Sequence, residues 1–190
     1  MYSPEEDSYL LAENVKNYIF SLKNIKKDNF RVLDMGSGTG IQAKTCINLG
    51  IKRENILCAD IDKEAIKYLK EQKLKAIRSN LFSDINKKNK FNLIIFNAPY
   101  LPEDRYDNKK DNIQTTAGKK GYELIIKFLK QASQYLKEEG RILLLFSSLS
   151  KPKIIIKEAK RLNYNSKKIS EKNIFFEKIL IYTLFKRIST

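Results

Sequence analysis

The sequence predicts a three-layer α/β fold in which a mostly parallel sheet is covered by helices on both faces. Apolar, strand-like runs alternate with segments of helical periodicity along most of the 190 residues, and this alternation is typical of parallel sheets. A Gly-rich turn over residues 34–40 follows the first strand-like run, as in doubly wound folds that bind nucleotides. Two strand-like runs near the end have no helix between them, so they predict an antiparallel hairpin.

Helix and strand patterns alternate through the first half of the chain. Ser3, Pro4 and Glu6 supply a cap, a proline at the first helical position and the acid of a capping box. Apolar residues then recur at helical spacing to about residue 22. The elements expected next are a strand over 30–33, a helix over 41–49 that Gly50 ends, a strand over 56–60, a helix through 65–69, a short strand at 76–77 and a strand over 91–96.

The second half continues the pattern after a long interruption. Residues 101–120 are polar, charged and without periodicity, which predicts a long loop. The elements expected after it are a helix over 122–136, a buried strand over 141–146, a helix over 153–162, and the two antiparallel strands over 166–170 and 175–185. No repeat or flexible linker divides the sequence, so we expect one domain over residues 1–190.

Composition excludes several kinds of chemistry. The sequence contains no histidine, which rules out Ser-His-Asp triads, histidine acid/base catalysis and the usual histidine metal sites, and we predict no metal. Cys46 and Cys58 are isolated, which favours small core residues in a reduced, cytoplasmic protein. No apolar run approaches the length of a membrane span, and the N-terminus lacks the apolar core of a signal peptide.

The net charge is +15, which suits an anionic partner such as RNA, DNA or a ribosomal complex. However, the lysines are scattered in pairs, and the richness in Lys, Ile and Asn is what AT-rich coding would produce. The charge is therefore compatible both with a polyanionic partner and with an ordinary solvated surface.

The Gly-rich turn is the predicted cofactor site. Asp34 precedes Gly36, Gly38 and Gly40 where a strand turns into a helix. Glycines allow the backbone to bend tightly and to approach a ligand, and a helix N-terminus offers free N–H groups. The spacing departs from the GxGxxG dinucleotide fingerprint, and Gly turns also occur in doubly wound folds without this role.

The ends of the next two strands extend the predicted cofactor site. Asp60 closes the second strand, where a carboxylate can accept hydrogen bonds from both ribose hydroxyls. Asn80 follows the third strand and is placed to hydrogen-bond an adenine edge. Their neighbours Ile61 and Leu81 are included in the site. Asp62, in contrast, can be explained simply as a helix cap.

The run Asn97-Ala98-Pro99-Tyr100, at the end of the strand over 91–96, is the predicted reacting centre. The side-chain oxygen of Asn97 and the backbone carbonyl of Ala98 can accept the two N–H groups of a planar amide or amino group. Pro99 fixes the corner, and Tyr100 offers a face for stacking. An ordinary strand exit also contains Asn and Pro. With the Gly-rich turn and Asp60 in the same chain order, the pattern favours an S-adenosylmethionine-dependent N-methyltransferase, with Asn97 also bordering the cofactor.

These motifs resemble the HemK family of protein glutamine N5-methyltransferases, in its short archaeal and eukaryotic branch. The opening residues 2–11 are similar to that branch's Y-x-P-x-E-D-[ST]-x-L-L start, and residues 118–123 resemble its GxxGxE segment. The resemblance implies a class I methyltransferase fold with a seven-stranded sheet, and an N-terminal helix over residues 1–24 lying on the cofactor side. It implies methylation of the glutamine in the GGQ loop of a class I translation termination factor, in the cytoplasm.

The resemblance also implies a partner, and the sequence departs from the family at two positions. Family members of this branch commonly work with a small zinc-containing activator protein, which would bind the sheet edge near Ala76-Ile77. The family pattern Asn-Pro-Pro-Tyr is altered here by Ala98, which removes a rigid ring. Asn80 stands where the family usually has Asp, so an acceptor remains without its charge. The Glu6-Asp7 pair is interpreted as helix-terminal acids rather than as catalytic groups.

Two other functions remain open from the sequence. An N6-adenine methyltransferase acting on DNA or RNA would use the same Asn-x-Pro-Tyr chemistry on another planar NH2 group, and the charge of +15 suits it. A non-catalytic, cofactor-binding regulatory subunit would explain Ala98 and Asn80.

Overall fold

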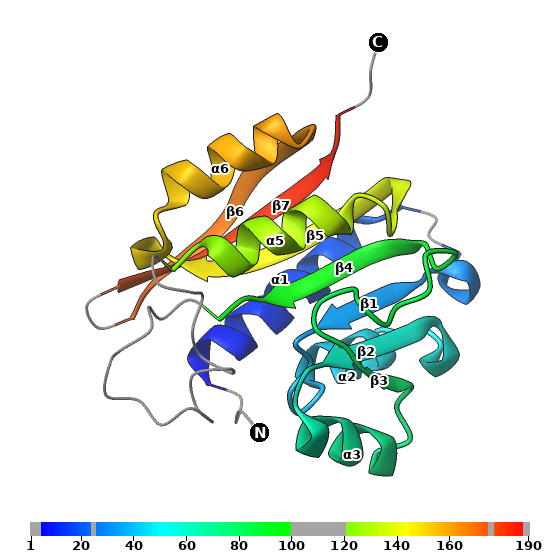
Figure 1. Ribbon diagram of the computed structural model, residues 1–190. Helices are drawn as coiled ribbons and strands as arrows, with labels where there is room; N and C mark the ends of the chain where they lie inside the picture. The colour runs from blue at the N-terminus through cyan, green and yellow to red at the C-terminus, as the bar shows by residue number, and fades with distance from the viewer. Residues whose placement is uncertain (1–4, 24–25, 100–120, 175–176, 188–190) are drawn as a thin grey trace.

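The computed structural model describes residues 5–23, 26–99, 121–174 and 177–187. A single seven-stranded sheet has the order β3-β2-β1-β4-β5-β7-β6 (Figure 1). Its strands are β1 (Val32–Met35), β2 (Ile56–Asp60), β3 (Ala76–Arg78), β4 (Phe91–Asn97), β5 (Leu136–Ser147), β6 (Tyr164–Ile174) and β7 (Glu177–Lys186). Strands β1 to β5 pair in parallel, whereas β7 pairs antiparallel with both β5 and β6. The predicted mixed sheet with a C-terminal hairpin is confirmed.

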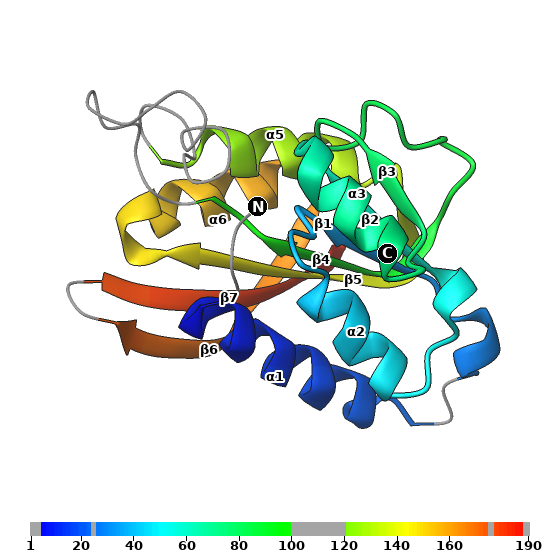
Figure 2. The same ribbon diagram turned by 90° about the horizontal axis from the view of Figure 1, so that it is seen from below.

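Helices cover both faces of this sheet. The face that carries α1 and α2 is opposite the face that carries α5 and α6 (Figure 2), and α3 contributes to the same core cluster as α1 and α2. The helices are α1 (Glu6–Ser21), α2 (Ile41–Asn48), α3 (Lys63–Glu71), α5 (Glu123–Ala132) and α6 (Pro152–Arg161), with short 3-10 helices at Lys27–Asn29, Arg53–Asn55 and Ser148–Ser150.

Two hydrophobic clusters sandwich the sheet because successive side chains of a strand point to opposite faces. In β4, Leu93 and Ile95 belong to the cluster under α1, α2 and α3, whereas Ile94 and Phe96 belong to the cluster under α5 and α6. All four side chains are at most 2% exposed, and burying each contributes about 1.5–3 kcal/mol. This doubly buried strand fixes the position of Asn97 at its end.

Several element boundaries differ from the predicted ones. Helix α1 begins at Glu6 with Glu5 as its N-cap and without a side-chain cap bond, so it starts two residues later than predicted. Strand β1 is likewise shifted by two residues and includes Asp34. The helix predicted over 122–136 was wrong in its last four residues: α5 ends at Ala132, and β5 begins at Leu136, which pairs with Phe91. The loop predicted over 101–120, and the capping residues Ser3 and Pro4, lie outside the described residues.

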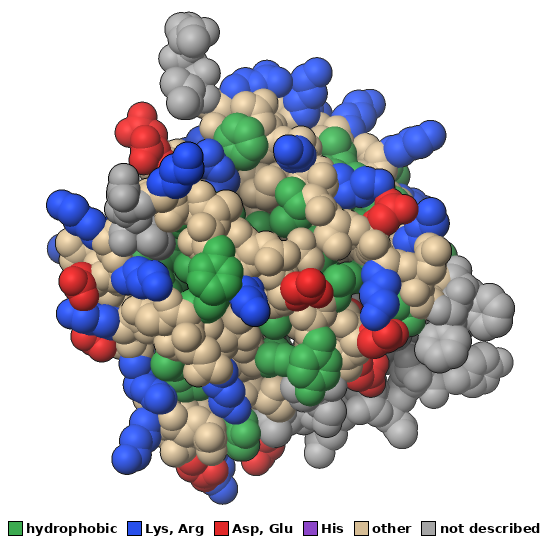
Figure 3. Space-filling model, turned by 180° about the vertical axis from the view of Figure 1, so that it is seen from behind, with side chains coloured by type: hydrophobic (Ala, Val, Ile, Leu, Met, Phe, Trp, Pro, Cys, Tyr) green, Lys and Arg blue, Asp and Glu red, His purple; other side chains and the backbone are tan. Residues whose placement is uncertain are grey.

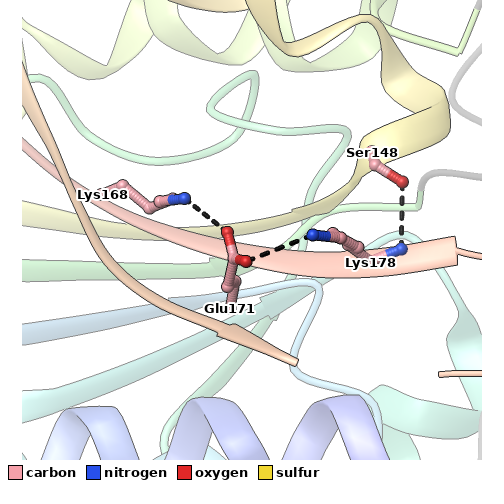
Figure 4. Close-up of polar contacts among 4 residues, drawn as sticks. All are labelled: Ser148, Lys168, Glu171 and Lys178. Carbon is pink, nitrogen blue, oxygen red and sulfur yellow. Dashed lines mark hydrogen bonds and ion pairs between the residues drawn. The ribbon is translucent and has the colours of Figure 1, made fainter. Parts of the chain in front are cut away.

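Polar contacts join β6 to β7 and link β7 to the segment that follows β5. Glu171 on β6 contacts Lys168 and Lys178, and the backbone N–H of Lys178 donates to Ser148 Oγ at 3.0 Å (Figure 4). The side chains of the three charged residues are 40–53% exposed, so solvent screens both ion pairs and they add little stability. The backbone hydrogen bond to Ser148 ties the hairpin to the short helix that follows β5.

Basic side chains are spread over the surface. In Figure 3, Lys and Arg side chains are distributed over the visible face, with acidic and uncharged side chains between them. Among the helices of the described segments, none is both long and apolar enough to cross a membrane.

Candidate active site

Those predicted site residues that the structure describes lie at the edge formed by the carboxyl ends of the parallel strands. The ends of β1, β2 and β4 lie there together with the first turn of α1 (Figure 1). Ligands of open α/β sheets bind at this edge. A Cβ built on Gly36 would lie 3.9 Å from the backbone oxygen of Asn97, so the Gly-rich turn and the predicted reacting centre are neighbours.

The Gly-rich turn requires glycine at its bends. Gly36, Gly38 and Gly40 have φ values of +63°, +50° and +74°, a region that other residues rarely adopt. A Cβ on Gly40 would lie 2.7 Å from Leu69 Cδ2. The N–H of Gly36 donates to the Ala59 carbonyl at 2.8 Å, which ties the turn to β2.

Asp60 lies at the end of β2 and organises the backbone around it. Its two carboxylate oxygens accept from the N–H groups of Gly38 at 2.8 Å and Asp62 at 2.9 Å. Each oxygen keeps a further lone pair, so hydroxyl donors can still approach. Burial raises the pKa of Asp60. Ile61 is half-buried next to it, and Asp62 caps α3 by accepting from the Glu64 N–H at 2.9 Å, as its alternative interpretation predicted.

Asp34 is the most deeply buried acid of the site. It is 2% exposed and accepts from the Ala43 N–H at 3.2 Å. Burial raises its pKa to about 7, the Ala43 hydrogen bond opposes this, and the nearby Asp60 adds to it. A cationic ligand beside Asp34 would favour the charged carboxylate.

The segment after β3 brings Asn80 to the same side of the sheet. Asn80 is exposed, and its backbone N–H donates to Ser83 Oγ at 3.2 Å. Leu81 is buried with φ +54°, and its carbonyl accepts from Ser79 Oγ at 2.7 Å. The Ser79 N–H donates to the Asp60 carbonyl at 2.8 Å. This hydrogen bond links the segment with Asn80, predicted to contact adenine, to the end of β2 with Asp60, predicted to contact ribose.

Asn97 has a fixed amide orientation. Its Nδ2 donates to Asp7 Oδ2 at 3.0 Å and lies 3.4 Å from Ser8 Oγ. Its Oδ1 is buried and has no hydrogen-bond partner among the described residues. A buried acceptor without a donor costs about 1–3 kcal/mol, so this oxygen is suited to receive a donor from a ligand.

The remainder of the motif continues the edge of β4. The Ala98 side chain is fully buried, and its N–H donates to the Leu145 carbonyl at 3.2 Å. A proline could not make this bond, so the departure from the family pattern exchanges a rigid ring for one more link between β4 and β5. Pro99 is half-buried, and Tyr100 lies outside the described residues.

Sequence reasoning missed three residues of this site. Asp7 and Ser8 contact Asn97, and Gln42 at the start of α2 donates from Nε2 to the Ser8 carbonyl at 2.9 Å. Asp7 also acts as the helix-terminal acid that was predicted, because its Oδ1 accepts from the Ser8 N–H at 2.5 Å. The available signal was the acid-hydroxyl pair at positions 7 and 8 of the opening motif.

The electrostatics of this edge differ from those of the whole chain. Although the net charge is +15, the carboxylates of Asp7, Asp34 and Asp60 gather here, and Gln42 Oε1 is a second buried oxygen without a partner in the described part of the chain. Acceptors of this kind fit a ligand that carries positive charge and N–H or O–H donors.

Comparison with known proteins identifies the family. The model of the methyltransferase small domain matches residues 16–173. A Methanocaldococcus jannaschii protein, whose name gives protein N5-glutamine methyltransferase as a proposed activity, is 34% identical over 98% of this chain and 92% of its own length. The release factor glutamine methyltransferase of Fusobacterium nucleatum is 30% identical over 72% of this chain, which spans only 41% of that protein.

Solved structures agree on the fold. The E. cuniculi Mtq2–Trm112 complex, described as responsible for methylation of the eRF1 translation termination factor, contains a chain with a TM-score of 0.74 and 22% identity, covering 97% of this chain and 98% of that chain. A ribosomal protein L11 methylase from Lactobacillus delbrueckii has a TM-score of 0.66 and 18% identity over 99% of this chain and 90% of that chain. With the strand order described above, these matches show the class I methyltransferase fold, and the chain belongs to the protein N5-glutamine methyltransferases of the methyltransferase small domain family.

Proposed function

We propose that this enzyme transfers a methyl group from S-adenosylmethionine to the side-chain amide nitrogen of the GGQ glutamine in a class I translation termination factor. The observation that carries the proposal is the Asn97 amide. Its NH2 end is held by Asp7 at 3.0 Å, and its buried oxygen has no donor among the described residues. A glutamine amide supplies such a donor.

The reactivity of an amide nitrogen explains why orientation matters. Its lone pair is delocalised, so the nitrogen is a poor nucleophile, and positive charge develops on it during attack. Acceptors aimed at its two N–H groups therefore bind the transition state better than the ground state. Asn97 Oδ1 and the Ala98 carbonyl would be these acceptors. Pro99 would restrict the backbone beyond them, and Tyr100 would stack on the planar amide.

The cofactor would bind along the Gly-rich turn. S-adenosylmethionine supplies the electrophilic methyl group. Asp60 would accept from the ribose hydroxyls with Ile61 beside them, and Asn80 and Leu81 would border the adenine. Asp34, with Gly36, Gly38 and Gly40, would shape the pocket for the cationic end. The buried carboxyl of Asp34 and the positive φ values of the turn fit this group.

A termination factor is the substrate best supported by the relatives. The F. nucleatum protein is named for glutamine methylation of a release factor, and the E. cuniculi complex is described by its action on eRF1. The second protein of that complex, Trm112, supports the prediction of an activator subunit. We place this subunit at β3, one of the two edge strands of the sheet, because the family resemblance predicts the activator at Ala76-Ile77. Its unpaired backbone groups can extend the sheet into a partner.

The test is transfer of labelled methyl groups to a purified termination factor, with and without a zinc-containing activator of the Trm112 kind. We expect label on the intact factor and none when the GGQ glutamine is replaced. Label that persists after this replacement would refute the substrate. Label in DNA or RNA instead would support the N6-adenine alternative.

A variant at Asn97 tests the mechanism. Asn97→Ala should abolish transfer and leave S-adenosylmethionine affinity, measured by calorimetry, within a fewfold of wild type. Unchanged turnover in this variant would refute the assigned acceptor. Cofactor binding without transfer to protein or nucleic acid by the wild-type enzyme would favour a regulatory subunit.

A further inference from the structure

We propose that Asp7 is a positioning residue that sets the orientation of the catalytic amide of Asn97. The inference rests on the proposed role of Asn97, and it assigns Asp7 a function beyond the helix terminus. Asp7 would not touch the substrate, because it would act through Asn97. Its carboxylate is 3% exposed although it belongs to the first turn of a surface helix, which places it against the sheet edge.

The direction of the Asn97 amide follows from the chemistry of its partner. An ionised carboxylate only accepts hydrogen bonds, so it must face the NH2 end of Asn97. The Nδ2–Oδ2 distance of 3.0 Å is an ordinary hydrogen-bond length. Holding Nδ2 in this way turns Oδ1 to the opposite side, where it can accept from a substrate amide. Without the hydrogen bond to Asp7, the Asn97 amide could rotate by half a turn. Its NH2 group would then face the NH2 group of the substrate, and two donors cannot pair.

An aspartate suits this position better than an asparagine would. Three donors of the described residues approach its two oxygens: the Ser8 N–H and hydroxyl reach Oδ1 at 2.5 and 3.2 Å, and Asn97 Nδ2 reaches Oδ2 at 3.0 Å. An asparagine side chain has one acceptor oxygen and one donor nitrogen. With its NH2 group toward Ser8, an asparagine would place a donor against the Ser8 N–H. With its NH2 group toward Asn97, it would force the Asn97 amide to rotate.

The segment that carries Asp7 is held against α2 and the core of the sheet. Gln42 Nε2 donates to the Ser8 carbonyl at 2.9 Å, which ties the first turn of α1 to α2. The pair of Glu6 with Lys172 of β6 is exposed and adds little to this support. Further along α1, Leu11 and Val15 are fully buried. A catalytic group supported in this way keeps its geometry between turnovers.

An exchange of the two side chains provides the decisive experiment. Asp7→Asn should lower kcat roughly 10²-fold, as misplacement of a reacting group commonly does, while S-adenosylmethionine affinity changes little. Asn97→Asp should also lose activity, because two buried carboxylates would face each other. The double variant Asp7→Asn/Asn97→Asp should recover at least tenfold over either single variant. In it, the new amide at 7 donates to one carboxylate oxygen at 97 and leaves the other as acceptor.

The matched control is Glu6→Gln, next to Asp7 in the same turn. Its partner Lys172 is 44% exposed and Glu6 itself 59% exposed, so kcat should remain within about twofold. No recovery in the double variant would overturn the proposal, and so would a loss in Asp7→Asn that lies entirely in cofactor affinity. The double variant decides the question even if a single variant fails to fold.

A measurement without turnover separates this inference from the proposed function. The side-chain NH2 signals of Asn97, assigned by their loss in Asn97→Ala, should exchange slowly with solvent in wild type. They should exchange at least tenfold faster in Asp7→Ala, because the hydrogen bond that protects them is gone. An unchanged exchange rate in Asp7→Ala would refute the proposal that Asp7 holds the Asn97 amide. If the signals behave as expected while no glutamine is methylated, the positioning role of Asp7 is supported and the proposed substrate is refuted.

Discussion

The buried carboxyl of Asp34 should make the stability of this enzyme fall as pH rises toward neutrality. Its pKa is about 7 in the folded protein, against 3.8 for an ordinary aspartate. One pKa unit corresponds to 1.36 kcal/mol, so ionising Asp34 lowers the free energy of unfolding by up to ~4 kcal/mol. Because the folded pKa is raised, the full stability is present below about pH 4. It decreases as pH rises and levels off above about pH 7.

The substitution Asp34→Asn tests this reasoning, since an amide keeps the shape and can accept from the Ala43 N–H but does not ionise. The difference in unfolding free energy between variant and wild type, measured by urea denaturation, should grow by roughly 2–3 kcal/mol from pH 5 to pH 8, with the variant gaining. Asp28→Asn is the control: Asp28 is 75% exposed and pairs with Lys52 at 2.9 Å. A difference for Asp34→Asn that is independent of pH would refute the argument.

The same titration should appear in ligand binding. A cationic cofactor beside Asp34 favours the carboxylate, so S-adenosylmethionine affinity should increase as pH rises through about 7. Calorimetry in buffers of different ionisation enthalpy should detect proton release on binding. Asp34→Asn should abolish this release, and persistence of proton release in the variant would assign it to another group.

Three further substitutions test the turn and the strand ends. Asp60→Ala should weaken S-adenosylmethionine binding roughly 10- to 100-fold, as expected for lost hydrogen bonds to a charged group; wild-type affinity in calorimetry would argue against the ribose role. Gly40→Ala should cost about 2–4 kcal/mol in urea unfolding, because the residue has φ +74° and the new Cβ would meet Leu69; a cost below about 1 kcal/mol would contradict the packing argument. Ala98→Pro should lower stability by about 1 kcal/mol through loss of the bond to the Leu145 carbonyl, and a more stable variant would show that ring rigidity outweighs that bond.

The sequence alone was enough to predict where the site residues at the ends of strands lie. Asp60 and Asn97 end apolar runs, and parallel strands deliver their carboxyl ends to one edge, so their neighbourhood could be predicted without coordinates. The positive φ values of the glycines were predictable as well, because a tight turn between a strand and a helix requires residues that can adopt them.

Contacts between distant segments were not predictable in this way. The hydrogen bond from Asn97 to Asp7 joins residues 90 positions apart. Helical periodicity identifies which face of α1 is buried, but it does not say which strand end the first turn reaches. The early start of β5 was hidden because its residues 137–139 are polar and lie outside the apolar run; pairing of Leu136 with Phe91 brings them into the strand.

The position of β7 has a consequence for how the chain acquires its structure during synthesis. Although β7 follows β6 in the sequence, it lies between β5 and β6 in the sheet. Until residues 177–186 have left the ribosome, β5 exposes one open edge and β6 has no strand to pair with. Open edges invite pairing with other chains, so we expect the nascent protein to be prone to aggregation until residues 177–186 insert between β5 and β6.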